Sequence, residues 1–295
     1  MEIDFLKYRK IYFIFSGILV LGSIIALAVF GLKLGIDFTG GSILEINYEE
    51  ARPSNQEIDS QLAGLDLGEI LVQPTGEKGV ILRMKEIPED THQEVINKLE
   101  ENRKLEEIRF EAIGPIIGQE TKEKTRLVII LALVSILLYV TFAFRGVSRP
   151  VKSWQYGIAT LIALFHDVLI PVGLFAVLGK FYGVEISVPI ITALLTVFGY
   201  SVNDTVVVFD RIRENLIKKN LPFEEAVNQS LNQTLSRSIS TSLTTLFVLL
   251  AIFFFGGYTL RFFSLALILG ISLGTYSSIC LASPILVSWL EWKKP

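Results

Sequence analysis

Six apolar segments of membrane-spanning length constrain the fold of this chain more than any other feature. A helix needs about 20 predominantly apolar residues to cross a bilayer. Hydrophobic residues make up 51% of the 295 residues and the mean hydropathy is +0.52, too apolar for an ordinary soluble protein. The sequence therefore predicts an α-helical polytopic membrane protein. Its six expected transmembrane helices are Ile11–Phe30, Leu127–Phe144, Trp154–Gly179, Ile186–Phe209, Ile239–Phe255 and Phe263–Leu290.

Basic residues in the short loops predict the orientation, because cytoplasmic loops of membrane proteins are enriched in Lys and Arg. The first apolar run is longer than the core of a signal peptide, so we expect a retained helix. The alternate loops carry only Lys180 and Arg261, and we therefore expect both termini in the cytoplasm. The basic residues on the expected cytoplasmic side are Lys7, Arg9, Lys10, Arg145, Arg149, Lys152, Arg211, Arg213, Lys218, Lys219, Lys293 and Lys294.

An acidic block separates the first and second spans. From Leu32 to Lys124 it holds 11 Lys and Arg against 20 Asp and Glu, whereas the rest of the chain is net basic. We expect three parts: residues 1–31 (cytoplasmic tail and first helix), an extracytoplasmic domain at 32–124, and residues 125–295 (the other five helices and a cytoplasmic C-terminus). Alternation and turn signals predict a small α+β domain of ferredoxin-like order β-α-β-β-α-β. Its expected strands are Gly41–Asn47, Ile70–Gln73, Val80–Met84 and Glu107–Ile113, and its helices follow capping boxes at Ser54 and Thr91.

The fourth span contains Asn203 and Asp204, which are unusual in a membrane helix. A carboxylate in hydrocarbon costs a few kcal/mol, so it usually faces a protein interior or a water-filled cavity. On a helical wheel the span divides into two arcs. The polar arc is expected to pack against other helices and the apolar arc to face lipid. The polar arc is Thr192, Thr196, Gly199, Tyr200, Asn203 and Asp204; the apolar arc is Ile191, Leu194, Leu195, Phe198, Val202, Val206 and Phe209.

Arg237 opens the next span at the same cytoplasmic depth as Asp204, on an arc with Ser240, Thr241 and Thr244. A carboxylate and a guanidinium on consecutive helices predict an ion pair that keeps the carboxylate charged. Changing that pairing would change the protonation of Asp204, which is what a proton-coupled movement requires. The alternative is a static buried ion pair that only orients the helices.

Two further features fall within the spans. His166 and Asp167 lie near the middle of the third span, where they serve either as an interhelical hydrogen bond or as part of a relay. Gly270 and Gly274 have the spacing that lets helices approach closely. The single cysteine, Cys280, excludes an internal disulfide and is expected to be a buried packing residue. No metal site is expected, because the two histidines lie in different parts of the chain.

After the first span, the stretch GIDFTGG contains Asp37, Gly40 and Gly41. Adjacent glycines allow a tight turn. A phosphate-binding loop would be followed by a helix, whereas a strand is expected here. We therefore predict a structural hinge and no bound nucleotide.

Long motifs in the expected order indicate a family. They are GIDFTGG, FRG in the second loop, FHDV in the third span, GYSVNDTVVVFDRIREN in the fourth, NQTLSRS before the fifth, and FFFGG with FSLALILGISLGTYSS at the sixth. Over nearly its whole length the chain resembles the SecF family of protein-export membrane proteins. These belong to the resistance–nodulation–division superfamily, whose members use twelve membrane helices as two related halves.

The resemblance implies an accessory function in protein transport and no enzymatic reaction. It implies an auxiliary subunit of the Sec translocase in the cell (inner, cytoplasmic) membrane, which with SecD uses the proton-motive force to promote late stages of protein export. The implied partners are SecD, the SecYEG channel, YajC, SecA, the translocating polypeptide and membrane lipids, with no nucleic acid, no cofactor and no enzymatic activity. Proton relay or coupling is assigned to Asp204, Arg237, Asp167 and Asn203, the role of Asp167 being either functional or structural.

Two other functions remain as alternatives. The chain could be half of a small-molecule or lipid exporter of the same superfamily, although about 90 residues leave little room for a substrate cleft in the inserted domain. It could also be a purely structural assembly subunit, with Asp204 and Arg237 as a static clamp. An intramembrane hydrolase is disfavoured because the spans contain no paired aspartates, HExxH motif or Ser–His arrangement.

Overall fold

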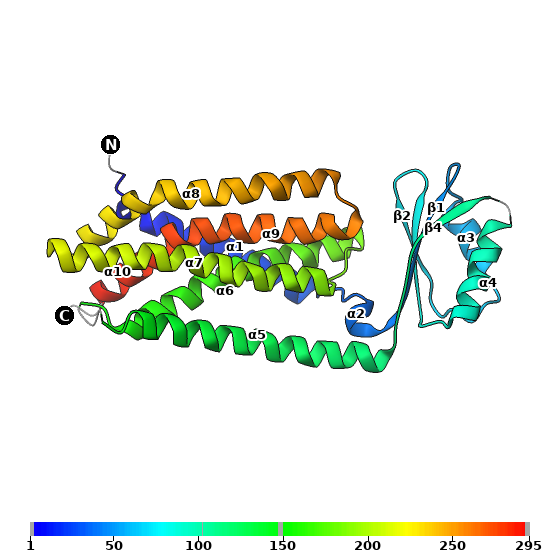
Figure 1. Ribbon diagram of the computed structural model, residues 1–295, viewed down its shortest axis with the longest axis horizontal. Coiled ribbons are helices and arrows are strands. Elements are labelled where there is room, and N and C mark those ends of the chain that lie inside the picture. Colours follow the sequence, from blue (N-terminus) through cyan, green and yellow to red (C-terminus); the bar gives the residue numbers. More distant parts are fainter. Residues whose placement is uncertain (1–2, 102, 147–149, 293–295) are drawn as a thin grey trace. The chain divides into compact units, whose positions relative to one another are not determined.

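The computed structural model describes residues 3–101, 103–146 and 150–292. The chain divides into two compact units, which are described separately (Figure 1). The membrane unit comprises residues 1–32, 128–184 and 188–295, and the α+β domain comprises residues 33–127 and 185–187. Of the basic residues used to predict the orientation, Arg149, Lys293 and Lys294 lie outside the described residues.

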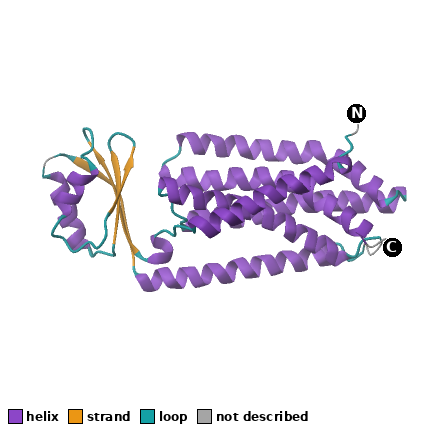
Figure 2. Cartoon of the chain, turned by 180° about the vertical axis from the view of Figure 1, so that it is seen from behind, coloured by secondary structure: helices purple, strands orange, loops and turns teal. Residues whose placement is uncertain are grey.

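The membrane unit confirms the prediction of six long apolar helices. The helices extend beyond the expected spans, and the last span is one α-helix followed by a π-helical segment and a second α-helix (Figures 1 and 2). Their bounds are α1 Arg9–Phe30, α5 Pro115–Ala143, α6 Ser153–Tyr182, α7 Val188–Lys219, α8 Phe223–Phe255, α9 Tyr258–Ser277, the π-helical segment Ser278–Ala282, and α10 Ser283–Trp292; a 3₁₀ turn, Leu6–Tyr8, precedes α1.

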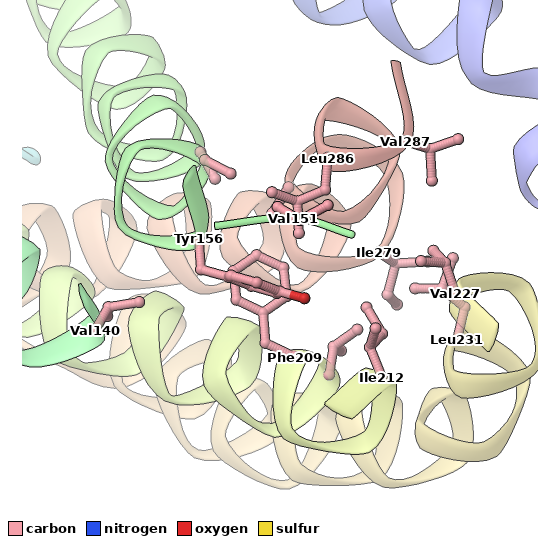
Figure 3. Packing of buried hydrophobic residues seen from close by; sticks show 14 of the residues in the cluster. Val140, Val151, Tyr156, Phe209, Ile212, Val227, Leu231, Ile279, Leu286 and Val287 are labelled. Atoms are coloured by element: carbon pink, nitrogen blue, oxygen red, sulfur yellow. The ribbon is translucent and has the colours of Figure 1, made fainter. Parts of the chain in front are cut away.

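A hydrophobic core joins α6, α7, α8 and α10 at the end of the bundle where α6 begins. Figure 3 shows the rings of Tyr156 and Phe209 at its centre, with Ile212, Leu231 and Leu286 around them. The two rings meet edge to face with centroids 5.1 Å apart. Helix α5 takes less part in this packing, since only 6% of its most apolar window is buried, against 61% for the last span.

Small residues bring the helices of the membrane unit together. A Cβ atom at Gly270 of α9 would overlap the side chain of Val197 on α7, and one at Gly274 would lie 3.0 Å from the Cβ of Ser201. A Cβ at Gly173 of α6 would lie 2.6 Å from the Cα of Ser23 on α1. At these positions the glycine backbone lies directly against the neighbouring helix, where a larger residue would not fit.

The α+β domain confirms the predicted ferredoxin-like order. Strands β1 (Gly41–Tyr48), β2 (Leu71–Thr75), β3 (Gly79–Met84) and β4 (Leu105–Ile113) form one antiparallel sheet in the order β2-β3-β1-β4. Helices α3 (Asn55–Leu62) and α4 (Glu89–Glu100) contribute to a core with residues from one face of this sheet (Figure 2). Leu44, Ile46, Val80 and Leu82 of the central strands are completely buried in that core.

One of the two predicted capping boxes is present. At the start of α3, the Glu57 backbone N–H donates to Ser54 Oγ at 3.3 Å, and the Ser54 backbone N–H donates to Glu57 Oε2 at 2.7 Å. The predicted box at Thr91 is wrong, because α4 begins at Glu89 and Thr91 lies inside its first turn. Acidic residues at the positive end of the helix dipole and a preceding Pro88 favour the earlier start.

The two adjacent glycines make the turn into β1. A four-residue helix, α2 (Ile36–Thr39), precedes them where a simple turn was expected. Gly40 and Gly41 adopt φ values of 76° and 129°, which disfavour a side chain. A Cβ would also lie 2.7 Å from Pro115 Cα at Gly40 and 2.8 Å from the Met84 carbonyl oxygen at Gly41. The pair is a close-packed corner of the domain.

The segment Glu185–Ser187, between α6 and α7, belongs to the α+β domain. The Gly35 N–H donates to the Ile186 carbonyl at 2.8 Å, and the Ile186 N–H donates to the Lys33 carbonyl at 2.7 Å. Glu185 Oε2 lies 3.1 Å from Arg83 Nε, and Oε1 lies 3.5 Å from Lys33 Nζ. Burial raises the pKa of the Glu185 carboxyl above its ordinary value, although both cations oppose the shift. The connection is therefore part of the domain's own structure.

We expect Ser54→Ala to destabilise α3 by about 1 kcal/mol, because it removes the acceptor of a helix N-terminal N–H. The hydrogen bond from the Ser54 N–H holds the pKa of Glu57 below its ordinary value. Glu57 therefore contributes to the stability of the folded domain at pH values above the pKa that its carboxyl has in the unfolded chain. That contribution is lost as the pH falls through the pKa of the carboxyl in the folded chain. Amide hydrogen exchange in α3 of the full chain measures both effects. Ser60→Ala is the control, since Ser60 Oγ donates within the helix to the Gln56 carbonyl; equal protection in the two variants would contradict the prediction.

Candidate functional site

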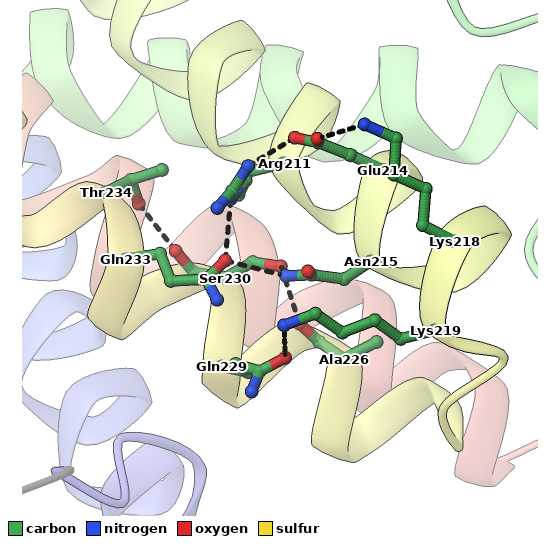
Figure 4. A network of polar contacts seen from close by, with 10 residues as sticks. All are labelled: Arg211, Glu214, Asn215, Lys218, Lys219, Ala226, Gln229, Ser230, Gln233 and Thr234. Carbon is green, nitrogen blue, oxygen red and sulfur yellow. Dashed lines mark hydrogen bonds and ion pairs between the residues drawn. The ribbon is translucent and has the colours of Figure 1, made fainter.

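A polar network fixes the register between α7 and α8. Beyond the apolar part of each helix, Asn215 Nδ2 donates to Ser230 Oγ at 2.8 Å and to Gln233 Oε1 at 2.9 Å (Figure 4). Arg211 Nε donates to the same Gln233 oxygen at 2.6 Å, and Lys219 Nζ donates to Gln229 Oε1 at 2.8 Å. These hydrogen bonds hold the two helices together near the α7–α8 connection. They therefore fix which residues of α8 face α7 at the level of Asp204.

Asp204 meets Ser238 rather than Arg237. The carboxylate is buried, with 6% of the residue exposed, and its Oδ1 accepts a hydrogen bond from Ser238 Oγ at 3.0 Å. Its Oδ2 is buried and has no hydrogen-bond partner among the residues that the structure describes. Arg237 is exposed and, within the same residues, forms no ion pair with Asp204. The predicted ion pair is therefore absent, because the neighbouring residue of α8 faces α7.

The assignment of the two α7 arcs was wrong. The apolar arc, predicted to face lipid, is the buried one: Phe198 and Val202 are each 7% exposed, and Phe209 is fully buried. Asp204 is the only residue of the predicted polar arc that is buried, whereas Thr192, Thr196, Gly199 and Asn203 are exposed. The apolar arc packs because Gly270 and Gly274 of α9 let α7 approach closely.

An exposed polar face therefore runs along α7 and α8 at membrane depth. Tyr200 Oη and Thr245 Oγ1, which lie 3.5 Å apart, connect the two helices. We call this surface the α7–α8 polar face; its exposed residues are Thr192, Thr196, Gly199, Asn203, Arg237, Ser240, Thr241 and Thr244. The threonine hydroxyls of this face donate to carbonyl groups of their own helices. The Asn203 amide and the Arg237 guanidinium are the groups that are costly to leave against lipid.

Asp167 lies at the centre of a second buried cluster. Its Oδ2 accepts hydrogen bonds from Ser201 Oγ of α7 and Ser277 Oγ of α9, both at 2.6 Å. Its Oδ1 lies 2.8 Å from His166 Nδ1. Asp167 is completely buried and His166 is 2% exposed, so both adjacent residues lie inside the bundle. The carboxylate thus connects three helices.

Further hydroxyl groups lie close in sequence to the two carboxylates and their partners. Ser201 lies one helical turn before Asp204 on α7, and Ser242 lies one turn after Ser238 on α8. Ser242 Oγ lies 2.5 Å from Thr275 Oγ1, and Thr275 precedes Ser277 by two residues on α9. The residues predicted from the sequence did not include Ser201, Ser238, Ser242 and Ser277. The signal that could have found them is serine and threonine recurring at one-turn spacing inside apolar helices.

The other candidate residues have structural surroundings. Asp37 lies in α2 and Gly40 and Gly41 follow it, in the α+β domain, and Gly270 and Gly274 pack α9 against α7. Cys280 is half-buried in the π-helical segment. Among the described residues, no group of three or more His, Cys, Asp and Glu side chains could hold a metal ion.

We expect Ser277→Ala to lower the free energy of unfolding by about 1–2 kcal/mol. It removes one donor to a buried carboxylate, and hydrogen bonds to charged groups contribute about 1.5–3 kcal/mol, or less within membranes. Thermal unfolding of the purified chain in detergent gives the difference. The control is Ser278→Ala, since Ser278 is equally buried but its Oγ donates to the Thr275 carbonyl. A loss no larger than that of the control would show that Asp167 does not depend on Ser277.

A six-helix bundle with carboxylates buried among hydroxyl groups, and a ferredoxin-like domain inserted after its first helix, defines a polytopic membrane protein of the transporter type. Family models match in two places: "Protein export membrane protein SecD/SecF, C-terminal" over residues 93–292, and "SecD/SecF GG Motif" over residues 25–51. The chain belongs to the SecD/SecF family.

Relatives are similar over nearly the full length. The chain is 45% identical to protein translocase subunit SecF of Thermobaculum terrenum, over 97% of this chain and 94% of that protein. It is 39% identical to SecF of Anaerolinea thermophila, over 99% of this chain and 96% of that protein. The crystal structure of SecDF from Thermus thermophilus, a translocon-associated membrane protein, superposes with a TM-score of 0.85 at 34% identity. The match covers 98% of this chain but 39% of the SecDF chain.

Proposed function

We propose that this chain is the SecF subunit of a Sec translocase and that, with a SecD partner, it uses the proton-motive force to promote late stages of protein export. The single observation that carries the proton coupling is Asp204. Its carboxylate is buried at membrane depth, one oxygen accepts from Ser238, and the other has no hydrogen-bond partner within the described residues. A carboxyl group with one unoccupied oxygen has room to take up a proton.

A SecD partner accounts for the α7–α8 polar face. The chain corresponds to 39% of the SecDF chain from Thermus thermophilus, so most of that protein lies outside the matched part. A second set of helices packed over Asn203 and Arg237 would shield both side chains from lipid. They would then lie within a protein interior close to Asp204. Both residues neighbour the buried pair Asp204–Ser238 along the chain. We infer that Asn203 and Arg237 act at that boundary.

The chemistry of the step is a change of charge on one side chain. Ionised Asp204 accepts the hydrogen bond from Ser238 and lies in the field of the Arg237 guanidinium. A proton added to the free oxygen removes the negative charge, and with it the attraction between Asp204 and Arg237. Ser201, one turn away on α7, is bonded to Asp167, so a movement of α7 is passed to the second cluster.

The orientation and the remaining partners complete the proposal. We infer that both termini lie in the cytoplasm and that the α+β domain lies on the opposite side of the cell membrane, where it acts on the translocating polypeptide. The basic residues at the α7–α8 connection, Arg211, Lys218 and Lys219, support this orientation. SecYEG, YajC and SecA are the further partners expected for such a subunit, which would have no catalytic reaction of its own.

Export into inverted membrane vesicles tests the proposal. Vesicles containing SecYEG and SecD, with or without this chain, are supplied with SecA, ATP and a secretory protein. We expect the chain to increase completed translocation only while a proton gradient is present, and a protonophore to remove the increase. An increase that survives the protonophore would favour a purely structural subunit. No increase at all would contradict a role in export, and the exporter alternative would then be tested with lipid and small-molecule substrates.

A further inference from the structure

Two hollows lie along the seam between α5 and α6, away from the carboxylate clusters. The first, of about 890 Å³, is lined by the end of α5, the beginning of α6 and residues of the connection between them. The second, of about 600 Å³, lies further along the same pair of helices and has an apolar lining that includes Ile129, Leu133, Ile162 and Phe165. Along α6, Gly157 lies between the two sets of lining residues and packs against α5: a Cβ there would lie 2.9 Å from Leu137 Cδ1.

The first hollow has the chemistry of a membrane interface. Arg145 and Lys152 line it, together with the aromatic side chains of Tyr139, Phe142 and Trp154. Both cations are exposed, and among the residues that the structure describes neither forms an ion pair with a carboxylate. The Arg145 guanidinium lies 4.0 Å from the centroid of the Phe142 ring. Tryptophan and tyrosine prefer the headgroup level of a bilayer, and unpaired basic residues there attract anionic lipids.

The second hollow lies at the depth of an acyl chain. From Trp154 to Phe165, α6 rises about 16 Å, close to the roughly 15 Å thickness of one hydrocarbon leaflet. Phe165 is 60% exposed and Ile162 is 43% exposed, so the hollow opens to the surface of the bundle. Only 6% of the most apolar window of α5 is buried, so this helix does not enclose the hollow. A headgroup at the first hollow therefore places an acyl chain within reach of the second.

We propose that the α5–α6 seam is a binding site for a phospholipid with an anionic headgroup. Arg145 and Lys152 contact the phosphate and the additional negative charge of the headgroup, Trp154 marks the interface, and an acyl chain lies in the apolar hollow. The charge of the first hollow is what selects this occupant. An apolar helix of a second protein would leave both cations without a partner. A zwitterionic lipid offers a phosphate, but its positive headgroup cancels that charge, so it attracts the two cations less than an anionic lipid does.

Quenching of Trp154 fluorescence by brominated lipids tests the site. The chain has three tryptophans, so a Trp289→Phe/Trp292→Phe variant of the full chain leaves Trp154 as the only one. It is reconstituted into phosphatidylcholine vesicles with a minor fraction of brominated phosphatidylglycerol, or with the same fraction of brominated phosphatidylcholine. We expect the anionic lipid to quench Trp154 well beyond its bulk fraction, and the zwitterionic lipid to quench it only in proportion to that fraction.

The charges are then removed in matched pairs. Arg145→Gln/Lys152→Gln should lower the preference for phosphatidylglycerol by about fivefold for each cation removed. Lys7→Gln/Lys10→Gln removes the same charge from exposed residues near the start of α1 and should leave the preference unchanged. Equal quenching by the two brominated lipids, or an equal loss in both double variants, would overturn the proposal. Protection of Trp154 from both lipids would also overturn it, because it would mean that protein covers the seam.

Discussion

Asp204→Asn is expected to reduce the proton-dependent part of export to the level of vesicles that lack this chain, a loss of at least tenfold. Asparagine has nearly the shape of aspartate and keeps an oxygen that can accept from Ser238 Oγ, now 3.0 Å from Asp204 Oδ1. It cannot take up and release a proton, so the variant retains the packing and loses the change of charge. The measurement is translocation into inverted vesicles with and without a protonophore, after the amount of SecD that co-purifies has been shown to be unchanged.

The control for that variant is Asp210→Asn on the same helix. Asp210 is exposed, and its carboxylate lies 3.7 Å from the Arg213 guanidinium on the helix surface. Exposed pairs of this kind contribute little, and we expect export to be unchanged. If Asp204→Asn also left proton stimulation intact, Asp204 would not be the coupling group. If it reduced the recovery of the complex with SecD, the carboxylate would act as a structural clamp.

Gly173→Ala is expected to lower the free energy of unfolding by about 3 kcal/mol, the upper end of the usual cost of overpacking. The added methyl group would lie 2.6 Å from Ser23 Cα and 2.7 Å from Ser23 Oγ. A backbone atom cannot rotate away as a side chain can, so α1 and α6 must separate. Separation loosens a contact that extends along both helices. Thermal unfolding of the purified chain in detergent, followed by circular dichroism, measures the loss.

Gly17→Ala on α1 provides the matched comparison. A Cβ at Gly17 would have nothing within 4 Å, and alanine is favoured over glycine inside a helix by about 1 kcal/mol. We therefore expect this variant to be as stable as the original chain or more stable. Equal melting temperatures for Gly17→Ala and Gly173→Ala would show that α1 does not depend on the close approach at Ser23.

The elements were predictable because each has a local physical cause. Membrane helices follow from apolar length, and the ferredoxin-like order follows from the alternation of the strands, the turn signal between β2 and β3, and the capping box at Ser54. The partners of Asp204 were less predictable. Asp204 and the start of the next span lie at equal depth, so the sequence correctly predicted that α8 lies opposite Asp204. The rotation of α8 about its own axis determines whether Arg237 or Ser238 faces Asp204, and the sequence did not give that rotation. That rotation depends on contacts made far along the hairpin by Asn215 and Gln233.

The burial of α7 could not be obtained from its own sequence. A helical wheel separates polar from apolar residues, but it does not say which arc meets the rest of the chain. Here α7 packs against α9 through Val197 and Ser201, which lie beside the apolar arc and meet Gly270 and Gly274. The polar arc was assigned to the seam within these six helices, although the family resemblance implied a second half. The chain covers 39% of the SecDF chain, and most of the residues of this arc are exposed in the six-helix unit.

The position of Glu185–Ser187 within the α+β domain has a consequence for the connection between α6 and α7. Helix α6, which carries Asp167, ends at Tyr182, and α7, which carries Asp204, begins at Val188. The residues between them are held by backbone hydrogen bonds to Lys33 and Gly35 and by the buried Arg83–Glu185 pair. The connection between the two helices that carry the buried carboxylates is therefore folded as part of the α+β domain, so a substitution at Glu185 or Ile186 changes the domain as well as the connection.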